Sequence, residues 1–199
     1  MNLKELFRSA VENIFEFIQI AVMAAIIVIP IRYFILQPFF VKGASMEPNF
    51  HDGEYLIIDE ISYRFKDILR GDVVVFKYPL DQSQYYIKRI IGLPGDTVRV
   101  RDGDVLVEPS GQQERLLLET YLPSQKITYS AGGGEITFHL GEGEYFVLGD
   151  NRRQSSDSRV WGVVKKDLIT GKVLLRAYPF QEANVFLSFP QPQLVPVLK

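Results

Sequence analysis

The sequence predicts a mainly β protein: a single N-terminal transmembrane helix, then a β-sheet or partly open β-barrel domain with a smaller inserted β lobe. An apolar run from residue 17 to residue 36 predicts the helix. Short segments rich in β-branched and aromatic residues follow it, separated by turns that contain glycine or proline. Strands that recur every 8–12 residues, roughly, are typical of sandwiches and barrels.

The composition excludes several kinds of site. Of 199 residues, 47% are hydrophobic and 23% are charged, which is typical of a folded domain with a core. A net charge of −2 leaves no basic field for nucleic acid, and the absence of cysteine excludes thiol nucleophiles and disulfides. His51 and His139 are the only histidines and do not have metal-ligand spacing. We therefore expect no metal and no cofactor, and a hydrolase here would need a base other than histidine.

The N-terminal segment fits a membrane anchor. From Phe17 to Leu36 only Gln19, Pro30 and Arg32 interrupt the apolar run. About 20 residues form a helix of roughly 30 Å, the thickness of a bilayer's hydrocarbon core. A cleavable signal has a shorter apolar region, and a buried core helix would need an equally apolar partner. We therefore expect residues 1–37 to be a tail and single span in membrane lipid, with an orientation that the basic residues alone do not decide.

Beyond the span, several segments have β character. The expected strands are Tyr55–Asp59, Asp72–Lys77, Tyr86–Ile91, Thr97–Val100, Val105–Val107 and Tyr145–Leu148. We expect one domain over residues 38–182, with a core formed by 38–101 and 144–182 and an inserted lobe over 102–143. Three prolines make the tail, 183–199, a poor candidate for regular structure.

Two segments carry residues suited to catalysis. Residues 39–50 (FFVKGASMEPNF) contain Ser45, and residues 85–96 (YYIKRIIGLPGD) contain Lys88 within an apolar strand. Strand alternation puts Lys88 and Arg89 on opposite faces, so one cation occupies an unusual position if either face is buried. The alternative for Lys88 is an exposed lysine at a sheet edge.

Together, four ordered motifs resemble those of the bacterial type I signal peptidases, or leader peptidases. They are GASMEP at 43–48, RGDVVVF at 70–76, YIKRIIGLPGD at 86–96 and GDNRRQSSDSRVWG at 149–162. Any one alone has a simpler explanation: Arg-Gly-Asp is usually a turn, and residues 149–162 could be a polar turn with self-paired charges. The resemblance depends on the ordered set, together with the N-terminal span.

The resemblance implies a membrane-bound serine endopeptidase that cleaves signal peptides from exported preproteins after the small residues of an Ala-x-Ala pattern. Its catalytic domain would lie on the extracytoplasmic face of the cytoplasmic membrane. Ser45 would be the nucleophile and Lys88 the general base, and the reaction would pass through an acyl-enzyme. A lysine pKa near 10.4 would have to fall by roughly 2–3 units for this role, which burial in an apolar site can cause.

The resemblance also implies roles for other residues. Ser155 would hydrogen-bond the lysine, and the charged residues that support the site would be Asp150, Arg152, Asp157 and Arg159. The pocket-lining positions would be Phe39, Val41, Met46, Tyr86 and Ile87. The backbone N–H of Ser45 would stabilise the oxyanion, and Gly43 stands where some members have a second, hydroxyl donor. Phe39 and Phe40 could also be interfacial anchors.

Two other functions fit part of the sequence. A self-cleaving Ser–Lys regulatory peptidase would need a DNA-binding helix-turn-helix, whereas residues 1–36 resemble an anchor. A membrane-tethered β module that only binds partners would give Ser45 and Lys88 no role. Proteolysis that rises through the lysine pKa would distinguish the peptidase from the binding module.

Overall fold

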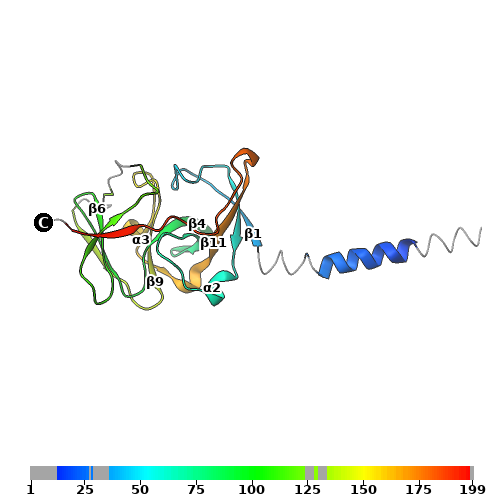
Figure 1. The fold of residues 1–199 in the computed structure, drawn as a ribbon, viewed down its shortest axis with the longest axis horizontal. Coiled ribbons are helices and arrows are strands. Elements are labelled where there is room, and N and C mark those ends of the chain that lie inside the picture. The colour runs from blue at the N-terminus through cyan, green and yellow to red at the C-terminus, as the bar shows by residue number, and fades with distance from the viewer. Residues whose placement is uncertain (1–12, 27, 29–35, 124–127, 130–133, 198–199) are drawn as a thin grey trace, which may run out of the picture.

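The computed structural model describes residues 13–26, 28, 36–123, 128–129 and 134–197. Two antiparallel sheets form most of this part of the chain (Figure 1). The mainly β prediction is therefore confirmed.

The larger sheet has the order β1-β2-β11-β3-β4-β9-β10, with β12 paired to β11. Its strands are β1 (Leu36–Phe40), β2 (Tyr55–Asp59), β3 (Val73–Tyr78), β4 (Asp81–Gly92), β9 (Glu144–Leu148), β10 (Val164–Lys165), β11 (Ile169–Tyr178) and β12 (Asn184–Val185). The late strand β11 lies between β2 and β3, so the two ends of the domain meet in this sheet.

The smaller sheet has the order β13-β7-β6-β5-β8 and lies at the opposite end of the β structure from β1 (Figure 1). Its strands are β5 (Thr97–Arg101), β6 (Asp104–Glu108), β7 (Arg115–Leu118), β8 (Ile136–His139) and β13 (Gln193–Pro196). Where the chain leaves the larger sheet, Gly92 lies so close to Leu140 and Val98 that a Cβ would collide with both.

Helices are short within the β domain. They are α2 (Ser62–Phe65), α3 (Ser158–Trp161), and the 3₁₀ turns η1 (Lys166–Leu168) and η2 (Phe180–Glu182). At the N-terminus residues 13–26 are helical, while residues 27 and 29–35 of the expected span lie outside the described residues. Within the described part of the chain, no helix has the length and apolarity needed to cross a membrane.

The pattern of buried side chains explains why these segments form strands. β2 alternates between exposed or half-buried and buried positions, whereas Val73–Phe76 of β3 is buried throughout. One core cluster in the larger sheet contains Met46 and Phe50 from the serine segment, and a second joins the smaller sheet to β4 and β9 of the larger sheet. The segment that carries Ser45 is thus anchored by its own apolar side chains.

Two expectations for the smaller sheet need adjustment. The sheet includes β5, which precedes the expected lobe at 102–143, and β13, which lies in the tail. The expectation of irregular structure throughout the tail was wrong for residues 184–185, which form β12, and for residues 193–196, which form β13. β13 is an edge strand that pairs with β7 alone, and an edge position tolerates Pro196 because proline lacks only the N–H donor. The domain boundaries themselves remain predictions.

Candidate active site

Ser45 lies in a tight loop between β1 and β2. The loop is closed at its base by backbone hydrogen bonds from Val41 N to Glu54 O (2.9 Å) and from Phe50 N to Met46 O (3.0 Å). Gly43 has a φ of 87°, which favours glycine, and its N–H donates to Asp52 Oδ1 at 2.6 Å. Because Met46 and Phe50 are buried in the core, the half-buried Ser45 is held at a fixed place on the loop.

Lys88 and Arg89 are both buried, at 4% and 1% exposure, although they occupy opposite faces of β4. Strand β4 pairs with β3 on one side and β9 on the other, so this part of the strand is covered. The alternative of an exposed edge lysine is excluded by this burial. Desolvation lowers the pKa of Lys88 from 10.5 to about 8, while the carboxylates of Asp157 and Asp150 act in the opposite direction.

The loop and the strand bring the two side chains together. Lys88 Nζ lies 2.8 Å from Ser45 Oγ and also donates to the Ile87 carbonyl oxygen at 2.8 Å. A base must lie within hydrogen-bonding distance of the proton that it removes, and this pair meets that requirement. At pH 7.5, an amine of pKa about 8 is neutral about a quarter of the time, against about 0.1% for an ordinary lysine.

A pocket of about 520 Å³ opens beside this pair. Four of the five expected pocket residues line it, namely Phe39, Val41, Tyr86 and Ile87. Met46 does not line it, because its side chain is fully buried in the core with Val41 and Phe50. The pocket lies between the 39–42 and 84–88 segments, and the Phe39 and Tyr85 rings approach to 5.2 Å.

The turn at residues 149–152 supports the serine loop. Asn151 N–H donates to Ser45 O at 3.0 Å, and the Asn151 amide donates to Ala44 O at 3.1 Å. A Cβ at Gly149 would collide with both Ser45 O and the Ser155 hydroxyl, so the close approach requires glycine. The main chain of Ser45 is therefore fixed from this side.

Ser155 does not form the hydrogen bond that the resemblance implies. Its Oγ is buried and has no hydrogen-bond partner among the described residues. The hydroxyl packs against Gly149, and Lys88 donates to the Ile87 carbonyl oxygen instead. A role for Ser155 in orienting the lysine remains a prediction.

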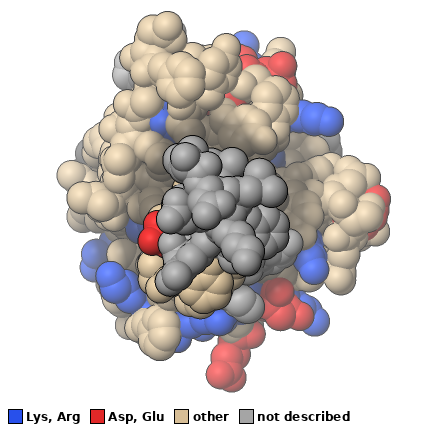
Figure 2. Space-filling model, turned by 90° about the vertical axis from the view of Figure 1, so that its right-hand side faces the viewer, with Lys and Arg blue, Asp and Glu red and all other residues tan. Residues whose placement is uncertain are grey.

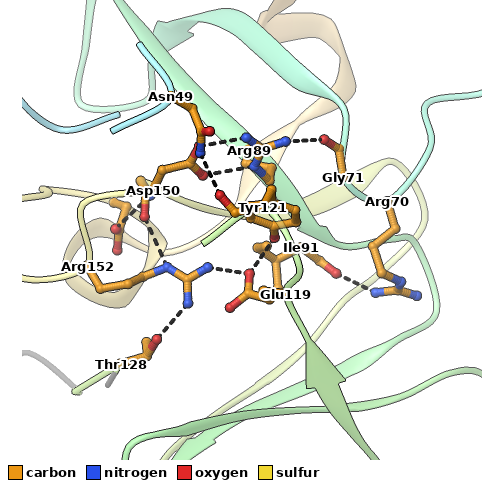
Figure 3. Close-up of polar contacts among 12 residues, drawn as sticks. Asn49, Arg70, Gly71, Arg89, Ile91, Glu119, Tyr121, Thr128, Asp150 and Arg152 are labelled. Atoms are coloured by element: carbon orange, nitrogen blue, oxygen red, sulfur yellow. Dashed lines mark hydrogen bonds and ion pairs between the residues drawn. The ribbon is translucent and has the colours of Figure 1, made fainter. Parts of the chain in front are cut away.

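The four expected support residues are each in an ion pair. Asp150 accepts two hydrogen bonds from Arg89 (2.8 and 2.6 Å), and Arg152 pairs with Glu119 (Figure 3). Separately, Asp157 binds Arg159 at 2.7 Å and accepts from Gly149 N at 3.0 Å. Because these charges are buried, each needs its partner to offset the cost of desolvation.

Sequence reasoning missed Arg89, Glu119, Tyr121 and Asn49 in this network (Figure 3). For Arg89 there was a signal, since adjacent cations in an apolar strand force one into an unusual place. Glu119, Tyr121 and Asn49 had no comparable signal, because their partners are distant in the sequence.

One group of possible metal ligands lies outside this site. Atoms of His51, Glu54 and Glu182 lie within 4.8 Å of one another. Glu54, the buried member, already pairs with Arg176 at 2.9 Å, so its charge is balanced without an ion. We assign no metal to this group.

Comparison with known proteins identifies the family. The family model described as signal peptidase, peptidase S26, matches residues 14–178. A signal peptidase I of Bacillus licheniformis is 33% identical over 171 residues, which cover 85% of this chain and 91% of the relative. A probable signal peptidase I-2 of Synechocystis is 35% identical over 182 residues, covering 88% and 78%.

Among solved structures, a signal peptidase I from Enterococcus faecalis is 36% identical and aligns with 54% of this chain and 97% of its own, at a TM-score of 0.44. The match of the family model over most of the chain, with the two curated relatives, establishes the assignment. The chain belongs to the signal peptidase family of S26 peptidases.

Proposed function

We propose that this protein is a membrane-bound serine endopeptidase that uses Ser45 and Lys88 to remove signal peptides from exported preproteins. One observation carries the proposal: a buried amine with a pKa of about 8 lies 2.8 Å from a serine hydroxyl, at the edge of a pocket. The family assignment supports signal-peptide cleavage as the reaction.

The proposed chemistry proceeds in two steps. Neutral Lys88 takes the proton from Ser45 Oγ as the oxygen attacks the scissile carbonyl carbon, and the backbone N–H of Ser45 donates to the developing oxyanion. The lysine ammonium then gives that proton to the departing amine, the C–N bond breaks, and an acyl-enzyme remains. In the second step neutral Lys88 takes a proton from water as the water oxygen attacks the ester carbonyl carbon. The bond between that carbon and Ser45 Oγ then breaks, the lysine ammonium returns the proton to Ser45 Oγ, and the new carboxyl terminus leaves.

The proposed substrate lies extended in the pocket. The end of β1 with the following residues, 39–42, and residues 84–88 of β4 flank it, so a peptide in β conformation could hydrogen-bond to their main chains. Phe39, Val41, Tyr86 and Ile87 give the pocket an apolar lining against which the alanine side chains of an Ala-x-Ala pattern could pack. The preference for small residues rests on the family assignment.

The proposed setting is the outer face of the cytoplasmic membrane, with residues 17–36 as the anchor. A row of exposed aromatic residues crosses the sheet directly after this segment: Phe40 is in register with Tyr55, Tyr55 with Tyr178, and the Tyr178 ring contacts Phe180. At the end of the molecule where β1 lies, uncharged residues cover most of the upper part of the view, and charges lie mainly toward the lower rim (Figure 2). Aromatic side chains of this kind favour the membrane interface.

The test uses the full chain in detergent and a preprotein with one Ala-x-Ala site. Mass analysis should give a single cut after the second alanine. Ser45→Ala and Lys88→Ala should each abolish this cut while their unfolding transitions remain cooperative. Substantial cleavage by either folded variant, or a cut elsewhere, would contradict the proposal.

A further inference from the structure

The turn that follows β7 contacts three elements of the site, although it belongs to the smaller sheet. Glu119 and Tyr121 lie in this turn, which is closed by a hydrogen bond from Leu122 N to Glu119 O at 3.1 Å. Figure 3 shows both side chains beside the buried ion pairs behind the site.

The first contact is with the serine loop, through Asn49. The Asn49 side-chain amide donates to the main-chain oxygen of Tyr121 at 3.1 Å and to Asp150 Oδ2 at 2.8 Å. The Asn49 main chain is held as well, since its N–H donates to Met46 O at 3.0 Å and its carbonyl oxygen accepts from Arg176. Displacement of the Tyr121 main chain therefore acts on the loop that carries Ser45.

The second contact is with the lysine strand, through Arg89. The Arg89 guanidinium carbon lies 3.8 Å from the centre of the Tyr121 ring, and its nitrogens bind Asp150 and the Gly71 carbonyl oxygen. Arg89 is fully buried, so this ring covers a cation that has no access to water. Because Arg89 follows Lys88 directly in β4, the position of Arg89 helps to fix the main chain of the strand at Lys88, the proposed general base.

The third contact is with the 149–152 turn, through Arg152. Glu119 accepts hydrogen bonds from both the Tyr121 hydroxyl and the Arg152 guanidinium. Arg152 also donates to Gly149 O at 3.0 Å, and Gly149 packs against Ser45 O. Through Arg152 and Gly149, the turn after β7 is thus also linked to the main chain of Ser45.

We infer that Tyr121 and Glu119 are positioning residues that hold the serine loop, the lysine strand and the 149–152 turn in one arrangement. The inference rests on the proposed Ser45–Lys88 reaction and adds the smaller sheet to the machinery that aligns it. Proton transfer and attack depend steeply on alignment, and a misplacement of about 1 Å can lower a rate by about 100-fold. Loss of Tyr121 should therefore slow the chemical step more than it weakens substrate binding.

The test measures single-turnover cleavage of the preprotein by the full chain in detergent, over a range of enzyme concentrations and of pH. Tyr121→Leu should lower the maximal single-turnover rate by about 10- to 100-fold. The enzyme concentration that gives half of this maximal rate should change by less than about 2-fold. Tyr121→Phe keeps the ring over Arg89 and should retain most of the rate. The variants remove no carboxylate or cation, so the pH midpoint of the rate should stay in place.

A matched control separates positioning from general loss of stability. Tyr63→Leu makes the same substitution at a tyrosine that packs against another core cluster, where it removes the ring and a hydrogen bond to the buried carboxylate of Asp72, and it should keep the wild-type rate. In Asn49→Leu the new side chain has nearly the shape of asparagine but cannot donate the hydrogen bonds to Tyr121 O and Asp150. This variant provides the test if Tyr121→Leu does not fold. If Tyr121 and Asn49 act as one unit, the double variant Tyr121→Leu/Asn49→Leu should lose little more rate than the slower of the two single variants.

The outcomes are distinct. Four results would each overturn the positioning role while Ser45→Ala stays inactive. They are a wild-type rate in both Tyr121→Leu and Asn49→Leu, additive losses in the double variant, a moved pH midpoint, and a loss of rate in Tyr63→Leu equal to that in Tyr121→Leu. Failure of the wild-type chain to cleave, or full cleavage by Ser45→Ala, would overturn the proposed function and this inference with it.

Discussion

Replacing Lys88 with methionine should make the folded protein more stable near neutral pH while abolishing catalysis. In the folded chain the amine is buried, and desolvation lowers its pKa from 10.5 to about 8. Methionine has a similar length and no charge to desolvate. The proposed base would then be a residue kept for function at the expense of stability.

The magnitude follows from the two pKa values. A fall from 10.5 to about 8 corresponds to roughly 3 kcal/mol, which burial of the charged lysine costs the wild-type protein below pH 8. Between pH 8 and pH 10.5 the unfolded chain still binds the proton and the folded chain does not, so wild-type stability rises with pH. Loss of the hydrogen bonds to Ser45 Oγ and Ile87 O offsets about 1 kcal/mol of the gain.

The predicted difference in stability can be measured by urea unfolding of the wild-type protein and Lys88→Met in detergent. Unfolding is followed by the fluorescence of Trp161, which packs against Phe76. At pH 7 Lys88→Met should be more stable by about 1–3 kcal/mol, and this difference should fall by about 2–3 kcal/mol by pH 10. Burial raises the pKa of Tyr63 and Tyr121 in the wild-type protein, and we expect the same in Lys88→Met, so their contribution should cancel in the difference between the two unfolding free energies. A difference in unfolding free energy that stays constant from pH 7 to pH 10 would refute the lowered lysine pKa.

Three further predictions follow from the site. The kcat/KM for cleavage should rise with pH and level off above a midpoint near 8, because the proposed base, Lys88, can accept a proton only in its neutral form; a flat profile from pH 6 to 9 would contradict this. Gly149→Ala should lower the melting temperature and cut kcat by about 10-fold or more, since the added methyl displaces the Ser45 carbonyl; normal activity in a cleavage assay would count against the close packing. Arg89→Met should lower the unfolding free energy by about 3–5 kcal/mol in urea titrations because it removes the guanidinium that pairs with the buried Asp150 carboxylate, and a loss below about 1 kcal/mol would contradict that account.

Local patterns in the sequence were enough to predict several strands. Tyr55–Asp59 has the predicted bounds, because alternation and β-branched residues act within the segment itself. β4 is longer than predicted, since polar residues 81–85 extend it by pairing with β3. β11 was not predicted, and its place between β2 and β3 depends on partners far away in the sequence.

For the site, the sequence by itself determined which residues could do the chemistry. With no cysteine and two unsuitable histidines, a hydrolase needed another base, and the resemblance of the four ordered motifs to type I signal peptidases implied Ser45 and Lys88 as nucleophile and base. The adjacent cations of β4 required an unusual environment for one of them if either face of the strand was buried. Only the tertiary structure decided that both cations are buried, that Lys88 lies against Ser45, and that Arg89 lies between Asp150 and Tyr121. Desolvation and ion pairing depend on which chain segments pack around a group, and no local pattern contains that information.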